Sequence, residues 1–201
     1  MYSLTGRLNT IAFNTLMVLA VLSAANFLSS YPFEFLGNKN GVHGRQPTIL
    51  SPFKVKEFDT FVKDNFINED ALSFKFDFKV DLEPLFNWNT NLIFTYISCE
   101  YNTTKSKMNV VTIWDQRVPR DRPQDHLVDL RNEYPEYYLT DYNKQLRDTD
   151  VTCHLNWEQM PVAGANYGSR IEIAKFRTPK NYISGSRRRY APGPEDRETN
   201  Y

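Results

Sequence analysis

Apolar residues follow two patterns along this chain, a continuous run near the amino terminus and alternating stretches after it. Between Arg7 and Glu34 lie 26 residues without a charge. The most apolar part, 11–28, would span about 27 Å as a helix at about 1.5 Å per residue, which matches a thin bilayer. Because a helix satisfies its own backbone hydrogen bonds, this length predicts a membrane-spanning segment at 11–30.

The same run also fits a secretory signal peptide, which needs only a shorter apolar region and a cleavage site of small residues. Residues 11–22 are long enough for that region, and Ser23-Ala24-Ala25 supplies such a site. The positive-inside rule separates the two interpretations poorly, since basic residues lie on both sides of the run. The run by itself therefore leaves an uncleaved anchor and a cleaved signal as alternatives.

The rest of the chain shows the two-residue alternation of half-buried strands. Over 72–80, Leu, Phe and Val occupy every second position, with Ser, Lys and Asp between them. One apolar and one polar face is typical of antiparallel sheets, because parallel strands are usually buried on both faces. The pattern predicts a mainly β meander, with further strands at 53–58, 92–100, 110–118, 151–157 and 170–176.

Three details refine this prediction. Asp81 is expected to cap a short helical turn, with Pro84 tolerated in its first turn. Residues 126–133 are expected to form a short surface helix. Within 151–157 the odd-numbered residues are expected to face inward, and His154 outward into solvent.

Changes in composition divide the chain into five segments. An amino-terminal 1–10 precedes the membrane segment 11–30, and a connector containing Gly and Pro covers 31–52. The β domain is expected over 53–183, which is long enough for a hydrophobic core. The last segment, 184–201, is a flexible polar tail, because it has few apolar groups to offset the entropy of ordering.

Charge and motifs exclude several classes of function. The 24 basic and 24 acidic residues balance, so no bulk field favours a nucleic-acid partner. The chain has no phosphate loop, no Gly-x-Ser-x-Gly elbow and no His-Glu-x-x-His zinc motif. Its histidines, His43, His126 and His154, are scattered. We therefore expect no cofactor and no metal site.

One short pattern fits catalysis. Ser51-Pro-Phe-Lys54 matches the Ser-x-x-Lys arrangement in which a lysine activates a serine nucleophile. A pattern with two fixed positions arises often by chance, so a serine protease is only a third hypothesis. We expect no catalytic residue.

Two features depend on the compartment. Cys99 and Cys153 either form a disulfide in an oxidising lumen or remain two buried thiols. Asn102-Thr103-Thr104 is an acceptor pattern for N-linked glycosylation, which matters only if this part of the chain enters the secretory lumen.

The block from Phe76 to Val118 contains an ordered set of segments: Phe76-Asp-Phe-Lys-Val-Asp-Leu-Glu-Pro-Leu-Phe-Asn-Trp-Asn-Thr90, Phe94-Thr-Tyr96, Glu100-Tyr101 and Asn109-Val-Val-Thr-Ile-Trp-Asp115. In this order and spacing, they resemble subunit 3 of the eukaryotic signal peptidase complex. The amino-terminal segment, Leu155-Asn-Trp157, Met160-Pro161 and Gly164 extend the resemblance over most of 1–176.

The resemblance implies a short cytosolic amino terminus, one uncleaved signal anchor of type II orientation and a lumenal β-sandwich-like domain. It places the protein in the endoplasmic reticulum membrane, in contact with lipid, the catalytic signal peptidase subunit and small membrane subunits. That catalytic subunit carries the serine and histidine of the peptidase, so the resemblance implies a non-catalytic role. The rival hypothesis is a secreted β-sandwich binding module whose signal has been cleaved.

The residues that match the family are expected to be structural or to form an interface: Asp81, Leu85, Phe86, Asn87, Trp88, Trp114, Asp115 and Trp157. Large aromatic side chains suit core or interface packing, and Asp and Asn suit hydrogen bonds to turns. An interface role for Asn87-Trp88-Asn89 is an alternative to a purely structural one, since aromatic anchors often carry binding energy.

Overall fold

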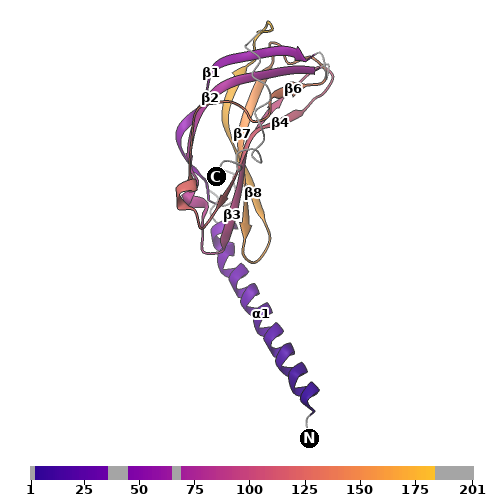
Figure 1. Ribbon diagram of the computed structural model, residues 1–201, viewed down its shortest axis with the longest axis vertical. Coiled ribbons are helices and arrows are strands. Elements are labelled where there is room, and N and C mark those ends of the chain that lie inside the picture. Colours follow the sequence, from indigo (N-terminus) through magenta and orange to yellow (C-terminus); the bar gives the residue numbers. More distant parts are fainter. Residues whose placement is uncertain (1–2, 36–44, 65–68, 184–201) are drawn as a thin grey trace, which may run out of the picture.

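A long apolar helix precedes a β domain in the computed structural model, which describes residues 3–35, 45–64 and 69–183. The helix α1 (Leu4–Phe35) contains a 26-residue stretch, Leu4–Ser29, that is long and apolar enough to cross a membrane. It extends from one end of the domain, with the amino terminus at the far end (Figure 1). The helix is thus longer at both ends than the predicted membrane segment.

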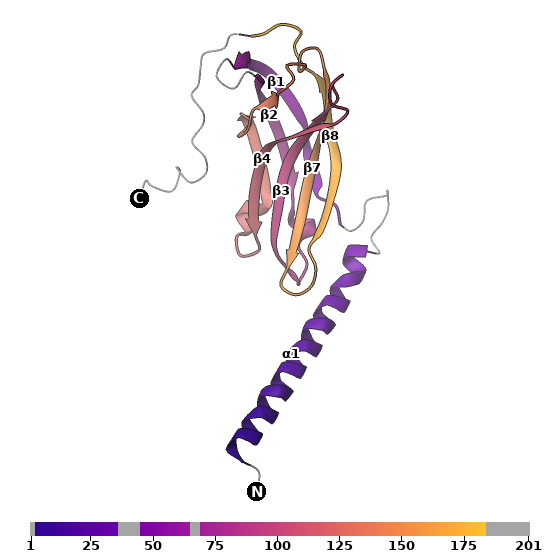
Figure 2. The same ribbon diagram turned by 90° about the vertical axis from the view of Figure 1, so that its right-hand side faces the viewer.

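The domain consists of two antiparallel sheets of four strands each. In the first sheet, β2 pairs with β1 on one side and with β5 and β6 on the other; the second has the order β4-β3-β7-β8. The two sheets pack around one core, as predicted for a β-sandwich-like domain (Figure 2). The strands are β1 (Thr48–Asp64), β2 (Glu69–Asp81), β3 (Thr90–Tyr101), β4 (Asn109–Pro119), β5 (Leu127–Glu133), β6 (Leu139–Asp141), β7 (Asp150–Pro161) and β8 (Tyr167–Arg177).

The alternation in β2 produces the expected two faces. Its apolar side chains at 72, 74, 76, 78 and 80 are at most 1% exposed and form much of the core. On the opposite face, ion pairs join β2 to its neighbours, for example Lys79 to Asp129 at 3.0 Å. Hydrogen bonds from Arg131 and Lys79 lower the pKa of Asp129 to about 2. The outer face of the first sheet is therefore exposed to solvent and carries ion pairs between neighbouring strands.

The second sheet supplies the facing half of the core. Its inward residues include Ile93 and Ile97 of β3 and Leu155 of β7, all fully buried. Trp157 lies opposite Thr95, and Trp114 lies opposite Ile97, so both indoles point into the sandwich. These aromatic side chains fill the space between the sheets.

Two predicted elements differ from the structure. The helix predicted at 126–133 is wrong: Leu127–Glu133 is the strand β5, preceded by the short 3₁₀ turn η2 (Pro123–His126). Pairing with β2 satisfies its backbone groups, and burying Val128 outweighs any local helical preference. The strand predicted at 53–58 is far longer, because β1 pairs with β2 from Thr48, within the expected connector, to Asp64.

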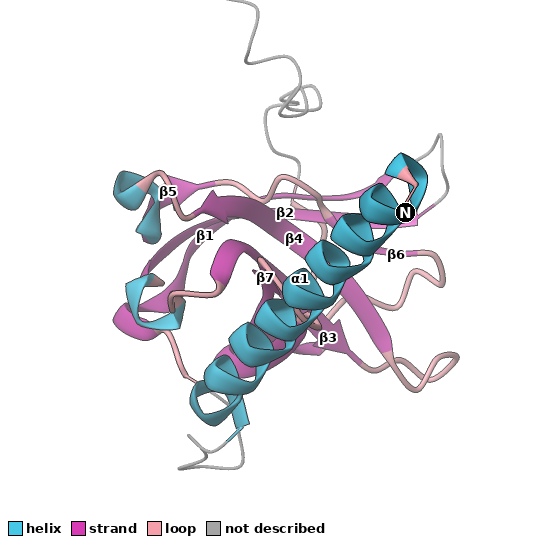
Figure 3. Ribbon diagram, turned by 90° about the horizontal axis from the view of Figure 1, so that it is seen from below, coloured by secondary structure: helices cyan, strands magenta, loops and turns pink. Residues whose placement is uncertain are grey.

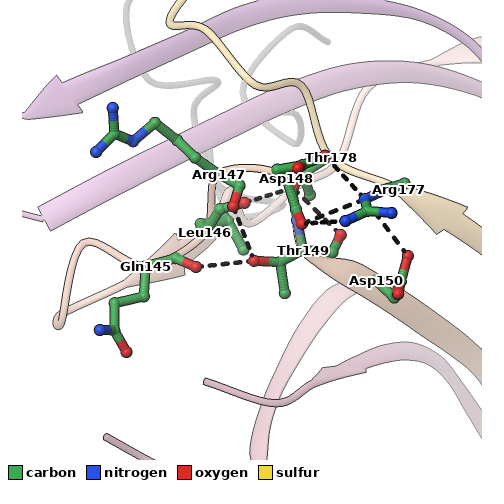
Figure 4. Close-up of polar contacts among 8 residues, drawn as sticks. All are labelled: Gln145, Leu146, Arg147, Asp148, Thr149, Asp150, Arg177 and Thr178. Atoms are coloured by element: carbon green, nitrogen blue, oxygen red, sulfur yellow. Dashed lines mark hydrogen bonds and ion pairs between the residues drawn. The ribbon is translucent and has the colours of Figure 1, made fainter. Parts of the chain in front are cut away.

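The end of the sandwich far from α1 is closed by polar contacts between the loop before β7 and the residue after β8. The Thr178 hydroxyl is almost completely buried, accepts a hydrogen bond from Thr149 N at 2.9 Å and donates one to the carbonyl of Leu146. Beside it, Arg177 Nε lies 2.8 Å from a carboxylate oxygen of Asp148 (Figure 4). The loop is therefore attached to β8 through the buried Thr178 hydroxyl and through an exposed ion pair beside it.

A disulfide joins the middle strands of the second sheet. Cys99 of β3 and Cys153 of β7 are directly opposite in register, with their Cα atoms 4.0 Å apart, and both are fully buried. The alternative of two separate thiols is therefore wrong. Closing a loop with a sequence separation of 54 removes conformational entropy from the unfolded chain. The chain-entropy relation puts this stabilisation at about 4 kcal/mol.

Replacing both cysteines by alanine should lower the free energy of unfolding by about 2–5 kcal/mol, because the unfolded chain regains that entropy and the core loses two sulfur atoms. The measurement is urea unfolding of the full chain in detergent, followed by fluorescence. The wild type treated with a reductant should approach the variant. Equal stability of variant and wild type would show that the bond does not constrain the domain.

Changing Thr178 to Val should cost about 1–3 kcal/mol of stability, because Thr149 N and the Leu146 carbonyl lose their partner while remaining buried. Thr178→Ser keeps the hydroxyl and is the matched control. Urea unfolding of the three proteins side by side makes the comparison. If Thr178→Val is as stable as the wild type, the hydrogen bonds of the hydroxyl do not stabilise the domain.

Candidate interface at the helix-facing end of the domain

The residues after β2 form a compact turn at the end of the sandwich that faces α1. The short 3₁₀ turn η1 (Glu83–Leu85) begins just beyond β2, and Asp81 Oδ1 accepts a hydrogen bond from Glu83 N at 2.9 Å. Leu85 is fully buried. The Asp81 side chain therefore orients this turn, and Leu85 anchors it in the core.

Phe86 connects this turn to η2. Its ring stacks on the imidazole of His126, with 4.1 Å between the ring centres and an angle of 15° between the planes. The backbone of His126 also accepts a hydrogen bond from Leu82 N at 2.9 Å. Arg45 donates to the Phe86 carbonyl at 3.1 Å. Figure 3 shows the short helical turns together on one side of α1.

Asn87 organises the next turn. Its side-chain oxygen accepts hydrogen bonds from Asn89 N at 2.7 Å and from Thr90 N at 2.9 Å. The hydroxyl of Thr90 in turn accepts from Asn87 N at 3.2 Å. An asparagine that bonds to the backbone two residues ahead holds a tight turn. The residue in the middle of this turn, Trp88, therefore has a defined orientation.

Asn89 ties this turn to a segment 74 residues later, the turn between β7 and β8. Its side chain donates to the Ala163 carbonyl at 2.9 Å and accepts from Ala163 N at 3.2 Å. Its backbone carbonyl accepts from Val162 N at 2.7 Å. Since Asn89 is only 1% exposed, water competes little for these bonds, and the two turns form one unit.

The outer surface of this unit is apolar. Trp88 is 46% exposed and Val162 is 68% exposed. Arg120 holds the Trp88 backbone from the β4 side, donating to its carbonyl at 2.6 Å. We call Trp88 and Val162, with the hydrogen-bonded turns that carry them, the apolar tip.

The turn between β7 and β8 also contacts α1. Gly164 has φ +118°, which side-chain-bearing residues rarely adopt, and a Cβ atom there would lie 2.5 Å from Cδ2 of Phe27. Figure 2 shows this turn beside the upper part of α1. A glycine is therefore required where the domain meets the helix.

The structure brings together Asp81, Leu85, Phe86, Asn87 and Trp88 but not the other residues that match the family. Trp114 and Trp157 are core residues, 5% and 2% exposed. Asp115 follows Trp114 on β4 and is paired with Tyr96. Sequence reasoning missed Val162 and Phe27, because their neighbours are distant in the chain. The only local hint was Gly164, in a break between two strands.

The remaining chemical candidates lie elsewhere. Lys54 is exposed on β1, and no hydrogen bond joins it to Ser51.

The side chain of His154 is only 13% exposed, 3.8 Å from the carboxylate of Glu100, which also pairs with Arg170. The expectation that His154 is solvated on its strand is therefore wrong, since neighbouring side chains cover it. Among the described residues, no group of three or more His, Cys, Asp or Glu could hold a metal ion.

Known proteins match this chain over the block from Phe76 to Val118 and beyond it. Proteins named signal peptidase complex subunit 3 are 30% identical in Caenorhabditis elegans, over 82% of this chain and 86% of that protein, and 38% identical in Homo sapiens, over 44% and 49%. The Saccharomyces cerevisiae protein of that name is 33% identical over 51% of this chain and 56% of its own length. The match to the human and yeast proteins thus spans about half of their length. A family described as "Signal peptidase subunit" matches residues 1–181, and the chain belongs to this family of signal peptidase subunits.

Proposed function

We propose that this protein is a non-catalytic, single-pass subunit of the signal peptidase complex in the endoplasmic reticulum membrane. It supports the removal of signal peptides by scaffolding the catalytic subunit, alongside small membrane subunits. The observation that carries the proposal is the family match over residues 1–181. The proposed topology has residues 1–10 in the cytosol, 11–30 in the membrane and the β domain in the lumen, from Thr48 at the start of β1 to residue 183.

Two features of the domain support a lumenal location. The buried Cys99–Cys153 disulfide suits an oxidising compartment. Asn102 is exposed directly after β3, at the end of the sandwich far from α1. The proposed tail at 184–201 lies outside the described residues.

The helix supports the anchor over the secreted binding module. α1 continues without a break through Ser23-Ala24-Ala25 and ends at Phe35. Phe27, two residues beyond that small-residue site, packs against Gly164 of the domain. The apolar stretch of α1, 26 residues long, also exceeds the roughly 7–15 apolar residues of a signal peptide, which favours the anchor.

The surroundings of the histidines, which are the candidate bases, support the non-catalytic role. A serine peptidase requires a base within hydrogen-bonding reach of its nucleophile. Among the described residues, neither His126 nor His154 is hydrogen-bonded to a hydroxyl, since His126 stacks on Phe86 and His154 faces Glu100. The third histidine, His43, lies outside the described residues. These arrangements favour peptidase chemistry in another chain.

The purified chain should cleave no preprotein, whereas cells depleted of it should accumulate uncleaved preproteins. Re-expression of the wild type or of Ser51→Ala should restore processing equally, because Ser51 has no base. Immunoblots of a preprotein and amino-terminal sequencing of the subunit give the readouts. Cleavage by the isolated chain would contradict the non-catalytic role, and a mature amino terminus at Asn26 would contradict the uncleaved anchor.

Glycosidase treatment should increase the mobility of the protein made in cells, because a lumenal Asn102 would carry a glycan. Asn102→Gln and Thr104→Ala should both migrate as the treated protein. Thr104→Ser is the control, since it preserves both the acceptor pattern and the hydroxyl that contacts Gln145 at 2.9 Å. A shift that persists in Asn102→Gln would exclude this residue as the acceptor.

A further inference from the structure

The contact between Phe27 and Gly164 fixes the height of the domain on the helix. Phe27 lies within the apolar stretch Leu4–Ser29, two residues before its end. Within the proposed membrane segment 11–30, Phe27 lies three residues before the lumenal end, which is about 4.5 Å along a helix at about 1.5 Å per residue. The turn between β7 and β8 therefore lies at the level where the helix leaves the hydrocarbon.

The apolar tip lies at the same level. Val162 is two residues before Gly164, and Trp88 is held to that turn through Asn89. Tryptophan is enriched at membrane interfaces because its ring is largely apolar while its N–H can bond to water or headgroups. Both exposed side chains belong to turns whose backbones are already ordered by hydrogen bonds, so little further ordering entropy opposes insertion.

Charge favours an apolar contact over electrostatic adsorption. The exposed charged residues around the tip have both signs, with Arg120 and Arg122 beside Asp121 on the turn after β4 and Glu83 on η1. Such a mixed surface gives no net attraction to an anionic leaflet. Arg120, fixed to the Trp88 carbonyl at 2.6 Å, remains available to a lipid phosphate.

Exposed aromatic and apolar residues alone would not single out this end of the domain. Tyr142 is 77% exposed and Met108 62% exposed near the opposite end. The 12 residues of β3 separate the two ends by roughly 40 Å. Only the end with Trp88 and Val162 contacts α1 among the described residues, so only this end is held at the bilayer surface.

We propose that Trp88 and Val162 insert into the boundary between headgroups and acyl chains, so that the domain touches the lipid bilayer at a second point besides α1. This inference rests on the proposed function in one respect, namely that α1 spans a membrane. Two points of attachment fix the tilt of the sandwich relative to the membrane. Its sheet faces then remain at a constant height for the other subunits.

The three tryptophans make the test selective. The full chain is reconstituted in phosphatidylcholine vesicles that contain lipid brominated near the top of its acyl chains, a contact quencher of indole fluorescence. Trp114 and Trp157 are 5% and 2% exposed, so they serve as internal references. We expect the brominated lipid to quench one component of the tryptophan fluorescence, and Trp88→Phe to remove that component. The quenching should not require anionic lipid.

Substitutions at Val162 report on insertion without disturbing the turn, because the hydrogen bond to Asn89 uses the backbone of this residue. Val162→Asp should abolish most of the quenching of Trp88, whereas the control Val162→Ile should retain it. Vesicle flotation and circular dichroism should be the same for both variants. Equal quenching in the Asp and Ile variants would overturn the insertion of Val162.

The remaining outcomes distinguish this inference from the proposed function. If the chain floats with the vesicles while Trp88 is quenched by aqueous iodide and not by brominated lipid, α1 is an anchor and the inserted tip is refuted. If the chain does not float, the anchor is refuted and the tip with it. If Trp88 loses access to iodide only when the other subunits are added, its partner is a protein, which also refutes lipid insertion.

Discussion

The register between β3 and β7 is the constraint on which the rest of the structure depends. The Cys99–Cys153 disulfide joins the two strands near one end, and the pairing runs without interruption from there to Leu92 opposite Met160. A slip of one residue would turn every inward side chain of β7, including Trp157, to the outer face. The hydrophobic core and the disulfide therefore enforce the same alignment.

This register also places the features at both ends of the domain. Beyond the start of β3, it brings Asn89 opposite Val162 and Ala163, so that the two turns bond to each other. Beyond its end, it leaves Asn102 exposed on the loop to β4. The apolar tip and Asn102, the proposed glycosylation acceptor, thus lie at opposite ends of one rigid strand pair, consistent with one end facing a membrane and the other facing the lumen.

The residues on which the family resemblance rests have distinct physical roles in the structure. Asp81, Leu85 and Asn87 shape the turn, while Trp114 and Trp157 fill the core. Trp88 alone among these tryptophans is substantially exposed, at the one end of the sandwich that contacts α1. The turn is therefore a rigid support for a single outward aromatic group.

The sequence by itself determined the local features of this protein. A long uncharged run implies a helix that can cross a membrane, and alternation implies strands with one buried face, because both depend only on neighbouring residues. The ordered segments between Phe76 and Asp115 were enough to indicate the family. Tertiary structure alone decided that Leu127–Glu133 is a strand, that Cys99 meets Cys153, and that Trp88, Val162 and Phe27 share one end of the domain. Each of these features depends on contacts between residues far apart in the chain. A local sequence pattern carries no information about the free energy of such contacts.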